Sequence, residues 1–159
     1  MYRVPRRIKQ DPEKRWALPD RVFFACGACH ILAFAFLERF PAAGFRAVWI
    51  KPAADFTGNH IVVVNAEGLA FDYHGYSGFG RLLSHMHAKA NRWWPGWNAT
   101  LTELPQGVLV SEAKSRTYGG LWLREPSQFL HNAMPRAERY LARFPAPAGR
   151  RDHVAARRA

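Results

Sequence analysis

The feature that most constrains the fold is a pair of cysteines followed at once by a long apolar run. The string Cys26-Gly27-Ala28-Cys29-His30 precedes residues 31–37, none of which is polar. A helix that is apolar on all sides must be buried. Pro41 is a stop signal for such a helix. The sequence therefore predicts a buried helix from about residue 28 to residue 40, with both thiols at its N-terminal end.

The composition is that of a folded chain with basic ends. The 159 residues are 48% hydrophobic, enough for one domain with a core. The net charge is +11, of which residues 1–15 carry +4, residues 136–159 carry +5 and residues 16–135 only +2. We therefore expect a basic N-terminal arm (1–19), a single catalytic domain (20–144) and a basic flexible C-terminal tail (145–159). Such ends attract an acidic partner or nucleic acid, and they also keep proteins soluble.

No membrane or export segment is predicted. The apolar run from residue 22 to residue 37 is shorter than the roughly 20 residues of a membrane span, and no small-residue cleavage site follows it. We expect a cytoplasmic protein without membrane contact. The two cysteines then favour catalysis or metal binding over a disulfide, although their spacing also suits two buried structural thiols.

A β-hairpin is predicted after the buried helix. Residues 60–64 include three consecutive valines, and residues 69–73 follow a three-residue loop, 66–68. With Gly68 in the left-handed conformation, such a loop places Asn65 opposite Leu69.

This register brings two residues of catalytic type together. Side chains alternate between the faces of a strand, so His60 and Asp72 share one face and are diagonal neighbours within hydrogen-bonding reach. The same register places Val62 opposite Asp72 and His74 opposite His60. We expect the buried helix to pack on this face.

The other predicted elements give an α+β fold, in which the buried helix packs on a small antiparallel sheet. We expect further strands at 45–51, 99–104 and 108–111, and helices at 79–93 and 126–144, the last interrupted near Pro135. Residues 1–19 are expected to be extended, residues 21–25 to be β-rich, and residues 75–78 to form a loop.

Three residues in this arrangement fit nucleophilic catalysis. A thiol attacks as thiolate, and an ordinary pKa near 8.5 leaves little thiolate at neutral pH. A helix N-terminus stabilises the thiolate of Cys29, a neighbouring His60 takes the proton, and Asp72 orients the imidazole. The first oxyanion donor would be the backbone N–H of Cys29.

The string Cys26-Gly27-Ala28-Cys29 resembles the nucleophile signature of papain-like cysteine peptidases, in which the second cysteine attacks. The order of a cysteine helix, a histidine opening a strand and an aspartate on the next strand also resembles transglutaminase-like proteins and arylamine acetyltransferases. The resemblance covers about residues 22–78. It departs from the papain pattern at His30, where that pattern has an aromatic residue, and at Phe23, where it has an oxyanion-binding glutamine. In this chain the gap from Cys29 to His60 is also much shorter than the corresponding gap in papain.

This resemblance implies a papain-like or transglutaminase-like core with Cys29 as nucleophile, His60 as general base and Asp72 as the orienting residue. The implied activity is that of a thiol-dependent acyl hydrolase or transferase: a peptidase, amidase, deamidase or transglutaminase-like enzyme. Its substrate would be a peptide, a protein or another amide or ester, and it needs no metal or organic cofactor.

Other readings remain open. Cys26-x-x-Cys29-His30 is also the attachment motif of c-type haem, with Met86 or Met134 as a second iron ligand. The two cysteines and His85-x-His87 would suit zinc. A basic module that binds nucleic acid through its ends and the tryptophan cluster at 93–97 is a non-enzymatic alternative. For an enzyme, the candidate substrate-binding residues are Asn59, His74, Trp94 and Trp97.

Overall fold

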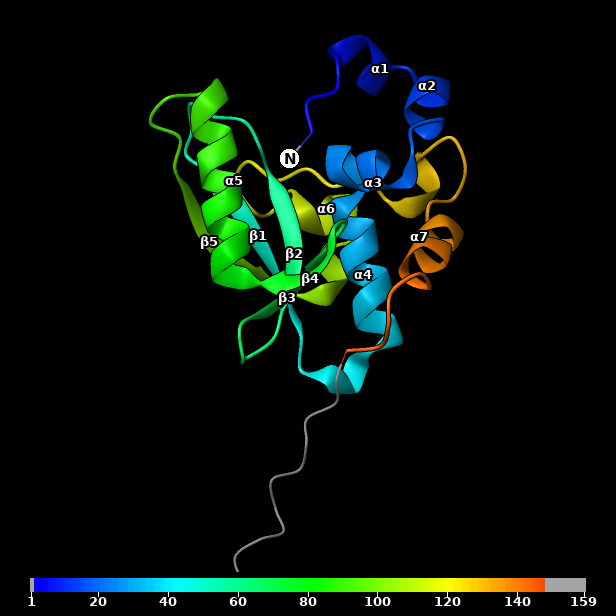
Figure 1. Ribbon diagram of the computed structural model, residues 1–159. Coiled ribbons are helices and arrows are strands. Elements are labelled where there is room, and N and C mark those ends of the chain that lie inside the picture. Colours follow the sequence, from blue (N-terminus) through cyan, green and yellow to red (C-terminus); the bar gives the residue numbers. More distant parts are fainter. Residues whose placement is uncertain (1, 148–159) are drawn as a thin grey trace, which may run out of the picture.

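A five-stranded antiparallel sheet with helices on both faces organises the chain (Figure 1). The computed structural model describes residues 2–147. The strand order is β4-β3-β2-β1-β5. The strands are β1 (Arg46–Pro52), β2 (His60–Val64), β3 (Leu69–Asp72), β4 (Gly75–Gly78) and β5 (Ala99–Leu104). The fold is therefore α+β, as the sequence predicts.

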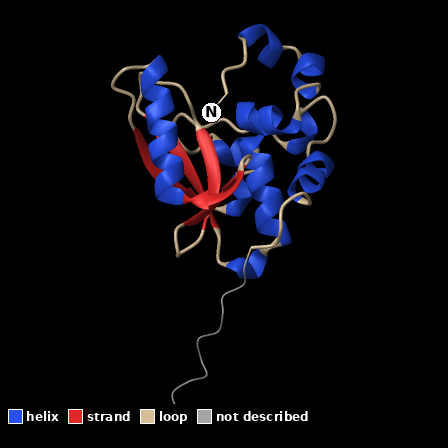
Figure 2. Cartoon of the chain, in the orientation of Figure 1, coloured by secondary structure: helices blue, strands red, loops and turns tan. Residues whose placement is uncertain are grey.

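The helices are short except for two (Figure 2). The α-helices are α1 (Arg6–Gln10), α2 (Pro12–Trp16), α3 (Asp20–Phe23), α4 (Cys29–Arg39), α5 (Phe79–Trp93), α6 (Glu112–Ser115) and α7 (Met134–Leu141). Short 3-10 turns occur at Pro41–Ala43, Gln106–Val108 and Pro126–Gln128. The bounds of α5 agree with the prediction because apolar residues recur on one side of this helix and Gly78 and Pro95 flank it.

The buried helix α4 contacts β2 and β3 on one side and α7 on the other. Phe36 has no exposed surface, and its ring stacks on that of Phe71 in β3 with the centroids 4.7 Å apart. Ile31 and Ala33 are buried in the same core. The predicted buried helix is confirmed, with an observed start at Cys29 and end at Arg39.

The prediction of which sheet face receives α4 is wrong. Ile61 and Val63 lie in the core with α4, whereas Val62 and Val64 lie in a second core with Met86 of α5. Because all five residues of β2 are buried, no alternation of polar and apolar residues distinguishes its two faces. Helices cover both faces of the sheet, and the sequence of β2 is compatible with α4 on either face.

The β2–β3 hairpin has the predicted register. Val63 pairs with Phe71, and the Asn65 amide donates to the Leu69 carbonyl at 3.0 Å. Gly68 has φ +76°, the left-handed conformation that the three-residue loop requires. The prediction that His74 lies opposite His60 is wrong, because the chain turns at residues 73–74 and returns as β4.

Several other local predictions are also wrong. Residues 75–78 form an edge strand instead of a loop, because they pair with β3. Residues 1–19 contain α1 and α2 instead of being extended, and residues 21–25 are helical. Residues 108–111 are not a strand, and residues 126–144 form a 3-10 turn and α7 rather than one interrupted helix. Of the predicted tail, residues 148–159 lie outside the described part of the chain.

The N-terminal segment is anchored to α7. Arg136 donates to the Asp20 carboxylate at 2.9 Å and to the Trp16 carbonyl at 2.6 Å. The helical run Asp20–Arg39 is long and apolar enough to cross a membrane by length and composition, but 56% of its most apolar window is buried inside the protein. This run therefore includes the central helix of the folded domain.

Tyr140 connects α7 to the chain directly after β3, and this contact yields a stability prediction. Its buried hydroxyl donates to the Tyr73 carbonyl at 2.7 Å. Tyr140→Phe leaves that carbonyl without its donor and should lower the free energy of unfolding by about 1–2 kcal/mol. Urea denaturation with an unchanged m-value measures this loss. Tyr76→Phe is the matched control, because the Tyr76 hydroxyl donates to Pro145 in an exposed position; an equal loss in both variants would contradict the prediction.

Candidate active site

A kink in the backbone sets Cys29 at the start of α4. Between α3 and α4 the chain makes an irregular turn, Phe24–Ala28, in which Cys26 and Gly27 leave helical geometry. Gly27 has φ +113°, which a residue with a side chain rarely adopts. Cys29 is partly exposed, whereas Cys26 is buried with 9% of its surface exposed. The kink thus begins a new helix at Cys29, where the macrodipole favours a negative charge.

His60 and Asp72 meet at neighbouring ends of β2 and β3. His60 Nε2 lies 3.1 Å from Asp72 Oδ2, and both side chains are buried. The backbone N–H of His74 donates to the other carboxylate oxygen at 2.7 Å. The Tyr73 ring packs edge-on against the imidazole, with the centroids 5.0 Å apart. Since Nε2 donates to the carboxylate, Nδ1 is the nitrogen available to exchange a proton with Cys29.

The thiol and the imidazole shift each other's pKa. Burial alone would raise the pKa of Cys29, but hydrogen bonds with His30 and His60 outweigh it and lower the pKa to about 5. Burial alone would lower the pKa of His60, but hydrogen bonds with Asp72 and Cys29 raise the pKa to about 9. Near neutral pH the pair is therefore a thiolate and an imidazolium.

The pKa values of Asp72 and Cys26 are also shifted, in opposite directions. Burial favours the neutral form of Asp72, but hydrogen bonds with His60 and His74 hold the pKa of this carboxyl well below its ordinary value. Burial raises the pKa of the Cys26 thiol, whose Sγ lies 3.9 Å from the Tyr2 carbonyl oxygen. Of the two cysteines, only Cys29 has a pKa below its ordinary value.

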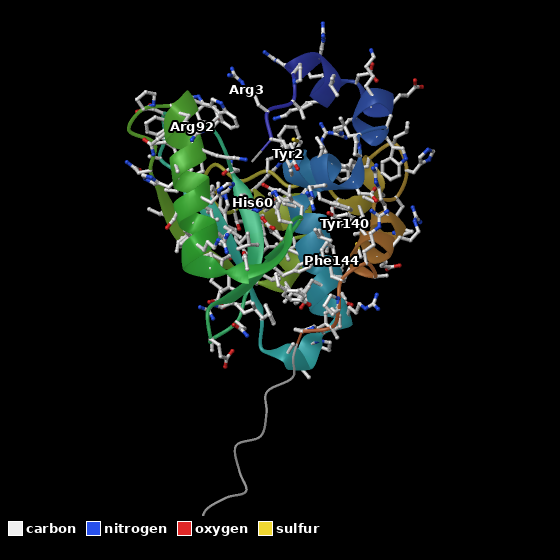
Figure 3. All side chains as sticks on the ribbon, in the orientation of Figure 1. Tyr2, Arg3, His60, Arg92, Tyr140 and Phe144 are labelled. Atoms are coloured by element: carbon white, nitrogen blue, oxygen red, sulfur yellow. The ribbon has the colours of Figure 1, made fainter. Side chains whose placement is uncertain are left out.

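Cys29 and His60 line a cavity of about 640 Å³. Its wall also includes residues from the N-terminal segment, from the β1–β2 connection and from residues 121–124. Figure 3 shows Tyr2 and Arg3 beyond the end of β2 at which His60 lies. A molecule in this cavity could therefore reach the Cys29 side chain.

The structure places the four predicted substrate-binding residues differently. Asn59 and Trp94 line the cavity, and the side-chain Oδ1 of Asn59 accepts from the Trp49 indole N–H at 2.8 Å. His74 is exposed, with Nδ1 3.7 Å from Asp72 Oδ1. Trp97 does not line this cavity: it is 3% exposed, packs in the α5 core and donates to the Thr57 carbonyl at 2.9 Å.

Several cavity residues were not predicted from the sequence. Arg3 and Arg15 come from the N-terminal segment, and Trp122 and Arg124 come from a stretch without regular structure. His30 connects this stretch to the site, because its Nε2 donates to the Arg124 carbonyl at 2.9 Å. No local motif marks these residues, since only long-range packing brings them to Cys29.

The described residues offer little support for a metal site or for bound haem. Within residues 2–147, no three His, Cys, Asp or Glu side chains gather closely enough to hold a metal ion. His85 and His87 are exposed on α5. His30 is 2% exposed and one of its ring nitrogens is already bonded.

Cys29, His60 and Asp72 are thus brought together, in this order along the chain, and Cys29 and His60 line the cavity. Comparison of the chain with protein-family models, with curated proteins and with solved structures found no match.

Proposed function

We propose that the protein is a thiol-dependent acyl hydrolase or transferase with a compact papain-like or transglutaminase-like core. The observation that carries the proposal is the placement of Cys29 and His60 on the wall of one cavity, with Asp72 Oδ2 3.1 Å from His60 Nε2. The lowered pKa of Cys29 and the raised pKa of His60 favour an ionised pair. Perturbed pKa values of this kind gather at functional sites. The helix that presents the thiol and the antiparallel hairpin that presents the imidazole and the carboxylate support the structural part of the proposal.

The chemistry proceeds in two steps. In the first, the Cys29 thiolate attacks the carbonyl carbon of an amide or ester and a C–S bond forms. The His60 imidazolium gives its proton to the leaving amine or alcohol as the C–N or C–O bond breaks. In the second, neutral His60 takes a proton from the acceptor, which attacks the thioester and releases Cys29 as thiolate. Water as acceptor gives hydrolysis, and an amine gives acyl transfer.

Asp72 acts on the imidazole and has no contact with the reacting carbonyl in this scheme. Its hydrogen bond to Nε2 fixes the tautomer that leaves Nδ1 toward the thiol, and its charge stabilises the imidazolium. The hydrogen bond from the His74 backbone holds the carboxylate in place.

An activated ester tests the proposal directly. We expect p-nitrophenyl acetate to acylate Cys29, detectable by mass spectrometry of peptides after rapid quenching, and p-nitrophenol to be released in a burst followed by slower turnover. Cys29→Ala should abolish both the acyl-enzyme and the burst. Cys26→Ala is the matched control and should retain them, because the Cys26 pKa is raised. A burst that survives in Cys29→Ala, or equal acylation of both cysteines, would refute the proposal.

A further inference from the structure

The cavity beside Cys29 is lined by cations and by no carboxylate. Arg3, Lys9, Arg15 and Arg124 line it, and within residues 2–147 the wall contains neither Asp nor Glu. The charge of the basic N-terminal segment is therefore directed in part toward the site. Positive charge in a cavity with low-dielectric walls raises the local concentration of anions.

Arg15 is the most unusual of these four residues. Only 9% of its surface is exposed, and its guanidinium carbon lies 4.9 Å from the centroid of the Phe129 ring. Among the described residues, neither Arg15 nor Arg124 belongs to an ion pair. Burying a charge without an opposite charge is costly, and the charge of Arg124 adds to the effect of burial in lowering the pKa of Arg15. A guanidinium nevertheless stays protonated in proteins.

The backbone of Arg124 is hydrogen-bonded to α4, the helix that begins with Cys29. Its carbonyl accepts the hydrogen bond from His30, the residue directly after Cys29. Arg15 and Arg124 both line the cavity that contains Cys29, and the charge of Arg124 contributes, after burial, to the lowered pKa of Arg15. An anion bound between them would relieve their repulsion and supply the missing opposite charge.

We propose that Arg15 and Arg124 form an anion-binding subsite that takes a carboxylate or phosphate group of the acyl substrate, beside the bond that Cys29 attacks. The planar fork of a guanidinium matches the oxygens of both groups. Trp94 and Trp122, on the same wall, supply apolar surface for the rest of the substrate. This inference rests on the proposed function and specifies the substrate as an anionic acyl compound.

Matched alkylating probes test the subsite without knowledge of the substrate. The iodoacetyl derivatives of a short ω-amino acid and of its amide have the same length and differ only in terminal charge. A third probe ends in a phosphonate. The measured quantity is the ratio of anionic to neutral alkylation rates at Cys29, at fixed ionic strength. We expect the wild type to prefer an anionic probe, and Arg15→Gln or Arg124→Gln to lower the ratio about ten-fold, as for one charge-assisted hydrogen bond.

Arg39→Gln is the matched control, because it removes the same charge from the exposed far end of α4. It should leave the ratio unchanged, and Arg15→Lys, which keeps the charge but loses the planar fork, should retain only part of the preference. Melting curves establish whether Arg15→Gln folds; if it does not, the half-buried Arg124 carries the test. Whichever of the carboxylate and phosphonate probes is preferred more strongly over the neutral probe identifies the anionic group of the substrate as a carboxylate or a phosphate.

A ratio that is the same in wild type, Arg15→Gln and Arg124→Gln, or that falls equally in Arg39→Gln, would overturn the subsite. A separate result would contradict the proposed function itself. That result is slow labelling of Cys29 by the neutral probe at pH 6, at the same rate in the wild type and in His60→Ala. Because an ordinary thiol also reacts at pH 9, the ratio at that pH reports on the subsite even in that case.

Discussion

Replacing His60 by alanine should move the pH midpoint of Cys29 alkylation from about 5 toward the ordinary range of a thiol. Hydrogen bonds with His60 and His30 lower the pKa of Cys29 against the opposing effect of burial. In the variant the thiolate loses the positive charge and the hydrogen bond of His60, while its desolvation and the hydrogen bond with His30 remain. We therefore expect a midpoint near or above 8, read by iodoacetamide labelling from pH 4.5 to 9.5 with mass spectrometry of each cysteine.

The change in rate will be smaller than the change in thiolate fraction. At pH 6, a shift of the pKa from about 5 to about 8.5 reduces the thiolate fraction roughly 300-fold. A thiolate of higher pKa is more nucleophilic, with a Brønsted slope of about 0.4–0.5, which restores roughly 40-fold. The rate at pH 6 should thus fall by about ten-fold, so the midpoint is the more sensitive measurement.

His74→Ala is the matched control for this experiment. It removes an exposed imidazole near the same carboxylate, but it keeps the backbone N–H that donates to Asp72. We expect its midpoint to stay close to that of the wild type. A wild-type midpoint above 8, or equal shifts in both variants, would show that no thiolate–imidazolium pair forms.

The meeting of His60 with Asp72 was predictable because it depends on local rules. The hairpin loop ends in a glycine with positive φ, which fixes the register, and the register fixes the diagonal pair. The kink at Gly27 and the apolar run likewise place Cys29 at a helix start without any distant contact. These features need only the residues within one hairpin and one helix.

Other parts of the site depend on contacts between distant segments and gave no local signal. Arg15 is on the short helix α2, which Arg136 of α7 anchors through a hydrogen bond to the Trp16 carbonyl; Arg136 also bonds to Asp20 of α3. Arg124 lies in an irregular stretch held by His30. A strand buried on both faces, such as β2, also does not show which helix covers which face. The sheet face of α4 and the cationic wall of the cavity were therefore missed.

The ionised pair should also leave a signature in the pH dependence of stability. The pKa of Cys29 falls from an ordinary value near 8.5 to about 5 on folding, and the pKa of His60 rises from about 6.5 to about 9. The lowered thiol pKa contributes stability that is lost as the pH falls through 5. The raised imidazole pKa contributes stability that is lost as the pH rises through 9.

Together, these two contributions determine how the free energy of unfolding depends on pH. Between pH 5 and 6.5 the unfolded chain protonates both groups, whereas the folded chain holds only the imidazolium proton, so stability rises with pH. The rise over this interval is about 2 kcal/mol. From pH 6.5 to the ordinary thiol pKa, each state holds one proton on the pair, and its contribution is level.

Cys29→Ser separates this signature from every other titrating group. The variant keeps His60 beside Asp72, which still raises the pKa of the imidazole, but it has no thiolate. Its stability should therefore not rise from pH 5 to 6.5 on account of this site, and it should fall above pH 6.5 as the imidazolium is lost. Urea denaturation of both proteins under reducing conditions gives the difference curve. We expect that curve to climb steadily from pH 5 to 8; a difference independent of pH would mean that Cys29 titrates as an ordinary thiol in the folded protein.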